Sequence, residues 1–337
     1  MRQLIIRRLL GVIPVIIGMT MLTFFISHII PSDPARLMAG PKASPEVVES
    51  YREKYGLNLP VWQQYLRYMA GVVKLDFGES FTTHRPVEQD LASYFPATME
   101  LTLGALLFAV IGGIGAGIIS AVWKDSWADQ ITRFIAVSGI SMPVFWFGLL
   151  AQLLFYQRLD WFPFGGRLSN DALVPATVTG MLTVDSLLAG NWETFFDALY
   201  HLILPAVILG FEPLAVLARI SRTALVEVMG EPYIITARSK GLTEKVVYFI
   251  HALRNAMLPV VTMIGLLVGY LLGGAVLVEV VFAWPGMGRY AAKAILASDY
   301  NGIMGVTLVI ALVYFFVNLI VDLLYARLDP RISYGES

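Results

Sequence analysis

Residues 231–259, EPYIITARSKGLTEKVVYFIHALRNAMLP, decide how this chain is organised, because they separate two apolar segments. A small residue, Ala237, lies four positions before Gly241, and amphipathic helical sequence flanks the pair on both sides. Small residues at this spacing let a short helix press its backbone into a groove on another protein. Glycine can then turn the chain through a conformation that other residues resist. We predict a helix-turn element outside the membrane that docks on a partner.

The composition identifies a multispanning membrane protein. Of the 337 residues, 57% are hydrophobic and 15% are charged, and the mean hydropathy is +0.69. Soluble domains carry nearer ~25% charged residues. A net charge of -1 gives no general attraction to nucleic acid. Because the chain has no cysteine, disulfides, thiol chemistry and thiolate metal sites are excluded.

Six segments are long and apolar enough to cross a bilayer, which requires about 20 residues each. Five contain no Asp, Glu, Lys or Arg, whereas the segment near 198–218 is interrupted by Glu212 and Pro213. A further apolar run, 172–184, is too short and contains Pro175, so we interpret it as a loop or interfacial piece. We predict an all-α membrane protein with six transmembrane helices at residues 9–30, 101–123, 134–157, about 198–218, 255–278 and 300–321.

The distribution of Lys and Arg predicts the orientation. Basic residues precede the first span, bracket the short second-to-third connection, fill the fourth-to-fifth connection and follow the sixth span. Positive charge in short loops marks the cytoplasmic side. Both termini are therefore predicted to be cytoplasmic. The predicted divisions are a retained N-terminal helix (1–30), an extracytoplasmic helical segment (31–97), a five-helix membrane domain (98–328) with a cytoplasmic loop at about 219–255, and a cytoplasmic tail (329–337).

The outer segment contains two predicted helices. The first starts at Ser44 as N-cap with Pro45 in its first turn, and it stops at Gly56. The second, about 60–74, has an apolar face that either packs on the membrane face of the protein or docks a soluble partner. That face consists of Trp62, Tyr65, Leu66, Met69 and Val73.

Several motifs for chemistry are missing from the sequence. It has no phosphate-binding G-x-x-x-x-G-K-[ST] motif, so ATP, if it drives this protein, binds to another polypeptide. The four histidines do not combine with carboxylates at ligand spacing, and no hydrolase triad is apparent, so no metal site and no catalytic residue are predicted. Glycines at 112, 113, 115 and 117, and at 265, 269 and 273, are typical of close helix packing in membranes.

Polar or kinked positions inside spans are candidates for a translocation path. Glu212 precedes a proline and is costly in lipid; it lines a hydrated route or faces a watery crevice with no specific duty. Pro143 allows the third span to bend, and Trp146 beside it is either packing or pore wall. Asn318 lies four residues before Asp322 on the last span, where Asp322 is solvated or paired with an arginine.

A turn follows the fifth span in the sequence VEVVFAWPGMGRY, which starts at Val278. Trp284, Pro285, Gly286 and Gly288 predict a tight turn, with Trp284 and the nearby Phe282 suited to the membrane interface.

Ordered matches along nearly the whole chain resemble the permease subunit of dipeptide and oligopeptide ABC importers, a branch of the binding-protein-dependent inner-membrane components. These stretches are RRLLGVIPVIIGMTMLTF, PSDPARLMAG, FPATMELTLGA, ISMPVFW, HLILPAVILG, YIITARSKGL, HALRNAMLPVVTMIGL, VFAWPGMGR and VNLIVDLLYARLDPRI. The general importer loop begins Glu-Ala-Ala and closes with Leu-Pro. Here Ile235, Thr236 and Ala237 fill the first slots and Leu253-Arg254 the last, which is the peptide-branch pattern.

The resemblance implies a type I ABC importer permease fold in the bacterial inner membrane. It implies a homologous second permease, two ATPase subunits that bind ATP and Mg²⁺, and an extracytoplasmic binding protein. That protein would contact 44–74, 158–199 and the turn at 284–289. The cargo is a di- or oligopeptide or another small solute, such as glutathione, a nickel chelate or a sugar. The resemblance implies ATPase coupling through Tyr233, Thr236, Ala237, Lys240, Gly241 and Leu242.

Two other classes of function compete with this reading. An ion-coupled secondary transporter would use buried acid networks, for which only Glu212 offers support. A membrane enzyme lacks a nucleophile or metal constellation in this sequence.

Overall fold

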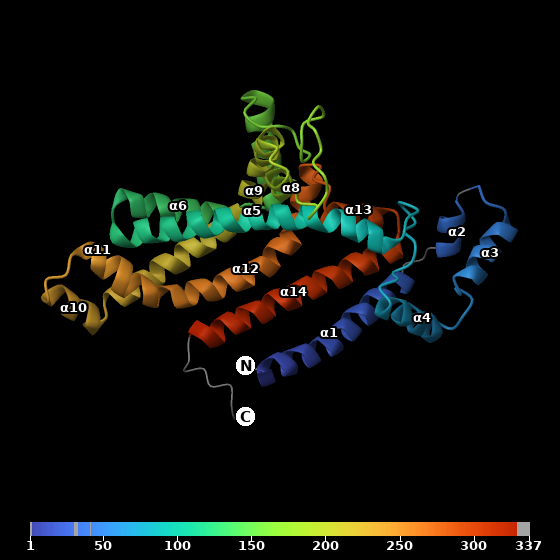
Figure 1. Ribbon diagram of the computed structural model, residues 1–337, viewed down its shortest axis with the longest axis horizontal. Helices are drawn as coiled ribbons and strands as arrows, with labels where there is room; N and C mark the ends of the chain where they lie inside the picture. Colours follow the sequence, from blue (N-terminus) through green and yellow to red (C-terminus); the bar gives the residue numbers. More distant parts are fainter. Residues whose placement is uncertain (1, 30–32, 41, 329–337) are drawn as a thin grey trace. The chain divides into compact units, whose positions relative to one another are not determined.

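The computed structural model describes residues 2–29, 33–40 and 42–328, and within them all regular secondary structure is helical apart from one isolated bridge between Glu79 and Pro86 (Figure 1). The predicted tail at 329–337 lies outside the described residues. The helices are α1 (Arg2–Ile29), α2 (Pro34–Ala39), α3 (Pro45–Lys54), α4 (Val61–Val73), α5 (Val87–Val122), α6 (Trp127–Ser141), α7 (Val144–Ala151), η1 (Gln152–Arg158), α8 (Leu182–Leu188), α9 (Trp192–Met229), α10 (Pro232–Ser239), α11 (Glu244–Val246), η2 (Val247–Ala252), α12 (Leu253–Val281), α13 (Met287–Leu296) and α14 (Tyr300–Leu328).

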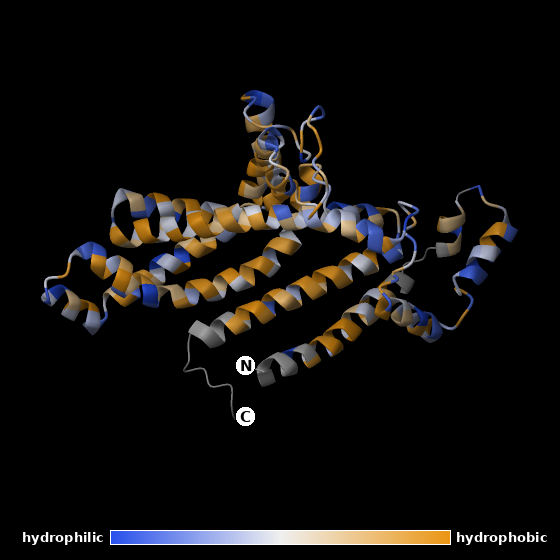
Figure 2. Cartoon of the chain, in the orientation of Figure 1, coloured by the Kyte–Doolittle hydropathy of each residue, from blue (hydrophilic) through white to orange (hydrophobic). Residues whose placement is uncertain are grey.

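Four continuous helical stretches are long and apolar enough to cross a membrane, within the described residues: Val87–Val122, Trp192–Met229, Glu244–Val281 and Tyr300–Val321. A bent helix pair forms a fifth candidate, and α1 contains a shorter apolar helix, Leu10–Ile26. Figure 2 colours these helices mainly hydrophobic. The prediction of an all-α membrane protein is confirmed, whereas the count of six spans stays a prediction.

The third predicted span is broken, not merely bent. Trp127–Ser141 and Val144–Arg158 meet at 109°. Pro143 has no backbone N–H and disfavours helical geometry at the residue before it. Met142 is accordingly extended, with φ -96° and ψ 127°. The prediction of one helix over 134–157 was therefore wrong in this respect.

The chain forms two compact units, which we describe separately. Unit 1 contains Thr98–Trp284 and the last helix from Phe316 onward. Its central helix is α9, which contacts α6, α7, α8 and α12. Pro205 and Pro213 lie inside α9 without ending it.

Glycines permit the close approach of α5 and α9 in unit 1. A β-carbon at Gly113 would lie 2.8 Å from the carbonyl oxygen of Leu214, and one at Gly117 would lie 2.8 Å from that of Ala218. Such distances leave no room for any side chain, which confirms close helix packing at Gly113 and Gly117, whereas a β-carbon at Gly115 would meet nothing within 4 Å. In α12, a β-carbon at Gly265 would collide with Val321 of α14, whereas Gly273 faces open space.

Unit 2 contains Arg2–Ala97 and Pro285–Phe315. Ser44 accepts a hydrogen bond from the backbone N of Val47 at the start of α3, and the helix ends shortly before Gly56, as predicted. The predicted second helix is α4, whose Trp62, Leu66 and Val73 side chains are exposed. The core of unit 2 is a cluster of buried residues, Phe77, Val87, Leu91, Met287, Tyr290, Val306 and Leu308.

Candidate functional site

The predicted docking element is α10, a helix of two turns that ends at a glycine turn. Pro232 occupies its first turn, where the missing N–H costs nothing. The helix stops at Ser239, and Gly241 follows with φ +79°. This left-handed conformation suits glycine and strains other residues. The backbone N of Gly241 donates to the carbonyl oxygen of Arg238 at 2.9 Å, which closes the turn.

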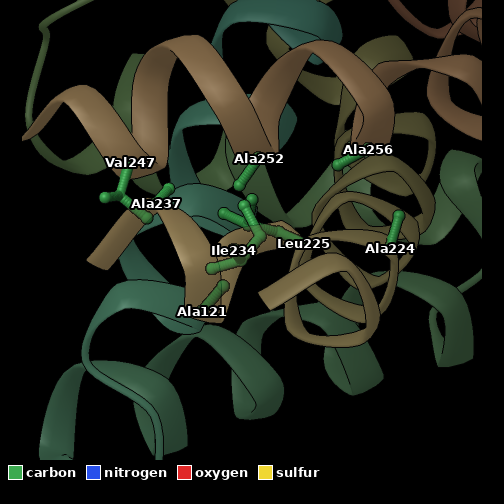
Figure 3. Packing of buried hydrophobic residues seen from close by; sticks show 8 residues of the cluster. All are labelled: Ala121, Ala224, Leu225, Ile234, Ala237, Val247, Ala252 and Ala256. Carbon is green, nitrogen blue, oxygen red and sulfur yellow. The ribbon is translucent and has the colours of Figure 1, made fainter. Parts of the chain in front are cut away.

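One face of α10 packs against its own chain. Ile234 and Ala237, three residues apart and therefore on the same face, are 0% and 6% exposed. They belong to a cluster that Figure 3 shows from close by, with Ala121, Ala224, Leu225, Val247, Ala252 and Ala256. The sequence predicts that Ala237 is small so that a partner can approach it. The structure corrects this reason, because Ala237 faces the helices of its own chain.

The opposite face of α10 and the turn after it are exposed. Ile235 is 57% exposed, and Tyr233 and Leu242 are each 39% exposed. Thr236, Lys240 and Gly241 are also exposed. Five of the six predicted docking residues thus share an accessible surface, which we call the α10 surface: Tyr233, Thr236, Lys240, Gly241 and Leu242, together with Ile235.

Polar contacts hold the α10 hairpin in shape. Arg238 donates two hydrogen bonds to the Glu244 carboxylate, at 2.9 and 3.1 Å. The Tyr233 hydroxyl accepts a hydrogen bond from the Asn255 side chain of α12 at 2.7 Å. These bonds connect α10 forward to α11 and α12.

A buried carboxylate beside this region was missed by sequence reasoning. Asp129 of α6 is fully buried, and the Arg222 guanidinium of α9 binds it with two hydrogen bonds of 2.7 and 2.9 Å. Arg133 and Ser120 also donate to it. The only signals in the sequence are the helix start at Ser126, three residues before Asp129, and the i,i+4 pair with Arg133. We call this group the Asp129 cluster.

A second buried cluster lies on α5, 20 residues before Ser120. The Glu100 carboxylate accepts hydrogen bonds from Arg167 at 3.1 Å and from both the backbone N and the hydroxyl of Thr183 at 2.7 Å. The Arg167 guanidinium lies 5.7 Å from the centre of the Trp284 ring. These residues, Glu100, Arg167, Thr183 and Trp284, form the Glu100 cluster. Sequence reasoning missed it because its members lie far apart along the chain.

The turn after α12 is buried and does not form an exposed surface. Phe282 and Trp284 are each 1% exposed, and Gly286 and Gly288 are also buried. Pro285 is half-buried, and Gly286 is the N-cap of α13. The turn itself was predicted correctly. Its assignment as a membrane-interface and binding-protein surface was wrong, because its large side chains pack inside the protein.

The predicted path residues lie on three helices of unit 1. Glu212 is half-buried, and the Tyr270 hydroxyl of α12 donates to its carboxylate at 2.5 Å. Trp146 is exposed on α7, directly after the Pro143 break. Asn318 is half-buried on α14, and the side chain of Asp322 lies outside the described residues. Among the described residues, no three His, Asp or Glu side chains gather as a metal site.

Comparison with known proteins assigns both parts of the chain to one class of transporter. Residues 113–334 match the model of the binding-protein-dependent transport system inner membrane component, and residues 1–102 match that of its N-terminal part. The probable D,D-dipeptide transport system permease protein of Escherichia coli strain K12 is 48% identical over 98% of this chain and 97% of its own length. The dipeptide transport system permease protein of the same organism is 44% identical over all of both chains. A glutathione transport system permease protein of E. coli O1:K1 is 41% identical over 99% of this chain and 100% of its own.

Proposed function

Because the chain belongs to the binding-protein-dependent transport system inner membrane component family, we propose that it carries di- or oligopeptides inward across the membrane. It is a permease subunit of an ABC importer, and the ion-coupled alternative has no support from its relatives. Peptides are the first choice of cargo because relatives at 44–48% identity are named for dipeptides. A glutathione-transporting relative keeps small peptide conjugates as a second choice.

The observation that carries the proposal is that one face of α10 is buried and the opposite face is exposed. Ile234 and Ala237 attach it to α5, α9 and α12, while the α10 surface is left accessible. The apolar side chains of this surface are Tyr233, Ile235 and Leu242. Together with the neighbouring Lys240 and the Arg238–Glu244 ion pair, they suit a groove on a soluble protein. The occupants of this surface are ATPase subunits. Two of them serve this chain and a homologous second permease.

ATP and Mg²⁺ bind on those separate ATPase subunits in this proposal, because the sequence contains no phosphate-binding loop. This chain contributes no catalytic residue. When ATP closes the two ATPases, α10 moves with them, and its anchored face passes the motion to α5, α9 and α12. Access to the path then alternates between the two sides of the membrane.

Glu212 lines the path in this proposal. A carboxylate facing lipid costs a few kcal/mol even on insertion scales. Its hydrogen bond with Tyr270 satisfies one oxygen and leaves capacity for water or for a peptide ammonium. Pro143, Trp146 and Asn318 are further path candidates. A cysteine at 212 should react with a water-soluble thiol reagent in at least one nucleotide state, whereas inertness beside a reactive control would remove Glu212 from the path.

An extracytoplasmic binding protein delivers the cargo to the segments predicted to lie outside. Within unit 2 these are α3 and α4, and α4 exposes Trp62, Leu66 and Val73. Within unit 1 they include the 158–199 region, which exposes Leu173, Val174 and Val178. The buried turn at Trp284 is no longer part of this surface.

Reconstitution of the permease pair in liposomes tests the function. With ATPases, binding protein and internal ATP, a labelled dipeptide should accumulate. Omission of either the ATPases or ATP should abolish uptake. Single cysteines at Thr236 and at Ala237 should differ in crosslinking to an ATPase subunit, with efficient trapping only from the exposed position 236. Uptake without ATPases, or equal trapping from both positions, would contradict the proposal.

A further inference from the structure

A cavity of about 730 Å³ lies wholly within unit 2. Its walls come from α1, α2, α3, α4, the α3–α4 connection, the 76–86 connection and the N-terminal turns of α5 and α14. The volume falls in the range of pockets that hold small molecules, ~300–1,000 Å³. The positive-inside reading puts most of these elements outside the membrane, and neither the α10 surface nor Glu212 belongs to the cavity.

Part of the cavity wall is aromatic. The ring of Phe24 stacks on that of Tyr68 at a centroid distance of 6.0 Å, and the ring of Phe81 meets that of Tyr300 edge-on at 6.4 Å. All four side chains line the cavity. An aromatic wall of this kind accepts an apolar or aromatic side chain.

Three polar atoms of residues that line the cavity are buried without a hydrogen-bond partner among the described residues. They are the hydroxyl oxygens of Tyr68 and Tyr300 and one carboxylate oxygen of Glu88. A buried polar atom left unpaired costs ~1–3 kcal/mol, and such atoms call for a bound group. Burial, with a smaller contribution from Tyr65, raises the pKa of Tyr68 to about 12, so its phenol remains a hydrogen-bond donor at neutral pH.

Charged groups of both signs complete the lining. Three carboxylates line the cavity. Glu79 accepts a hydrogen bond from the Tyr55 hydroxyl at 3.2 Å and Asp76 from the backbone N of Gly78 at 3.0 Å, whereas Glu88, in the first turn of α5, has one buried oxygen without a partner among the described residues. Arg67 supplies a cation from α4, with its guanidinium lying over the Gly56 turn, where a β-carbon would be 2.6 Å from Nη1. Lys54 adds a second cation, with its ammonium 5.1 Å from the centre of the Tyr55 ring. No ion pair joins Glu88, Arg67 or Lys54 to another described residue.

The chemistry of this lining selects one class of ligand. A simple cation would satisfy Glu88 but leave the tyrosine hydroxyls and Arg67 without an acceptor. A simple anion would leave the buried Glu88 oxygen unpaired. A metal ion lacks enough clustered carboxylates here, because no group of three potential ligands forms among the described residues. A small zwitterion with an apolar side chain offers each of these groups a partner of matching charge or polarity.

We propose that this cavity binds a free amino acid or a short peptide by its two charged ends. Glu88 receives the ammonium group, and Arg67 with the hydroxyls of Tyr68 and Tyr300 holds the carboxylate. The aromatic wall receives the side chain. The inference rests on the proposed function for its choice of peptide, and it adds a binding site on the permease itself, separate from the binding protein.

Equilibrium dialysis on the full-length permease in lipid nanodiscs, without binding protein or ATPases, tests the site. The probes are labelled alanyl-phenylalanine, its N-acetyl derivative and its C-terminal amide. We expect saturable binding of the free dipeptide and loss of about ten- to a hundredfold in affinity when either end is blocked, as for the removal of one charged hydrogen-bond partner. Glu88→Gln should weaken binding of the free dipeptide by a similar factor, and so should Arg67→Gln.

The blocked probes distinguish the loss of one charged contact from misfolding, because a misfolded variant would lose affinity for every probe. Glu88→Gln should hardly change the residual affinity for the N-acetyl probe, and Arg67→Gln should hardly change that for the amide. Glu53→Gln and Arg36→Gln are matched controls on the same unit outside the cavity lining, and both should bind the dipeptide as wild type does. Absence of saturable binding to the wild-type permease would overturn the inference, as would equal binding of free and N-acetylated dipeptide.

Uptake by the complete transporter separates this inference from the proposed function. ATP-dependent peptide uptake by a permease that binds no dipeptide alone would overturn only the cavity site. Retained dipeptide binding in a transporter that imports no peptide would support the site and overturn the proposed cargo.

Discussion

The two ends of α5 in unit 1 are built for different purposes. Near Ser120, the Asp129 cluster adjoins the α10 hairpin, which lays two apolar side chains on its own chain and exposes the rest. Near Glu100, the Glu100 cluster encloses Trp284, and almost nothing of that side chain is exposed. The α10 hairpin and the turn at Trp284 are both short, contain glycine and proline, and lie beside a membrane helix. They differ in burial: the α10 hairpin exposes a surface to a partner, whereas the side chain of Trp284 is enclosed in the protein.

The spacing of these two clusters fits a membrane. Glu100 and Ser120 are 20 residues apart on one helix, which corresponds to about 30 Å at 1.5 Å per residue. The hydrocarbon core of a bilayer has about the same thickness, ~30 Å. Each cluster therefore lies near one boundary of the core, where charged groups are least costly.

Trp284→Ala should give the largest effect and test whether the Glu100 end is structural. Removal of a buried large aromatic side chain costs ~3–5 kcal/mol. We expect a lower thermal midpoint and less purified permease. Trp192→Ala, which removes a 60% exposed tryptophan, is the control and should change stability by no more than ~0.5 kcal/mol. Equal midpoints for the two variants would remove the structural role of Trp284.

Arg222→Gln should give the next largest effect, at the Asp129 end. Breaking a buried ion pair costs ~3–5 kcal/mol when the remaining charge has no partner. Since Asp129 retains Arg133, we expect a loss below that range. Arg133→Gln should cost less, because both arginines bind both carboxylate oxygens but the Arg133 side chain is 51% exposed and that of Arg222 only 20%. Thermal melts of the two variants measure this order, and the reverse order would contradict the assignment of Arg222 as the main partner.

Ala237→Trp should sharpen the comparison, because it overfills the anchored face of α10. Overpacking costs ~1–3 kcal/mol. The hairpin should detach, so that trypsin cleaves faster at Arg238 and Lys240 and peptide uptake falls by about tenfold or more, while the thermal midpoint drops less than in Trp284→Ala. Thr236→Trp on the exposed face is the control: it should impair ATPase docking without faster cleavage. Unchanged cleavage of Ala237→Trp would show that α10 is not anchored there.

Gly241→Val should disturb only the turn after α10. A β-carbon there would meet nothing within 4 Å, so the cost arises from φ +79° and amounts to about 1 kcal/mol or more. Peptide uptake should fall moderately with normal insertion. Gly241→Asn, a residue that tolerates this conformation better, should recover most of the uptake. Equal uptake by the two variants would show that backbone conformation at 241 does not matter.

Acidification should produce the smallest effect, confined to the loop before α8. Burial alone would raise the pKa of Asp185, but hydrogen bonds from Thr179 and Gly180 outweigh it and hold the pKa below its ordinary range. The ionised carboxylate therefore stabilises the loop at neutral pH, and this stabilisation is lost as pH falls below about 4. Proteolysis of the loop at graded pH should show the change. Asp185→Asn should be cleaved readily at every pH, and an unaltered pH profile in that variant would contradict the role of Asp185.

Local features were readable from the sequence, whereas contacts between distant residues were not. The Ser44 cap, the α4 helix, the Gly113 packing and the turn at Gly241 each follow from residues within one turn or one helix face. Arg222 was counted only as a positive loop charge, since nothing in a single sequence indicates that it meets Asp129, 93 residues earlier. Arg167 and Glu100, 67 residues apart, were missed for the same reason.

Two corrections have a shared physical cause. Trp284 was expected at an interface and Ala237 against a partner, but each side chain is enclosed by its own chain. Residue type gives the preference for an apolar environment, but it does not tell which molecule provides that environment. The sequence indicates that Pro143 weakens the helix, but it does not determine the angle between the two halves, because that angle depends on how each half packs on its neighbours.

The contact of Gly113 and Gly117 with the backbone of α9 has a mechanical consequence. Two helices whose backbones touch gain nothing from a small separation, because neither lipid nor water fits the gap and the attractive contacts are lost at once. We expect α5 and α9 to move as one rigid body during the transport cycle. Conformational change then takes place at helix–helix interfaces without such backbone contact. The 109° bend at Met142–Pro143 is the position where we expect a hinge.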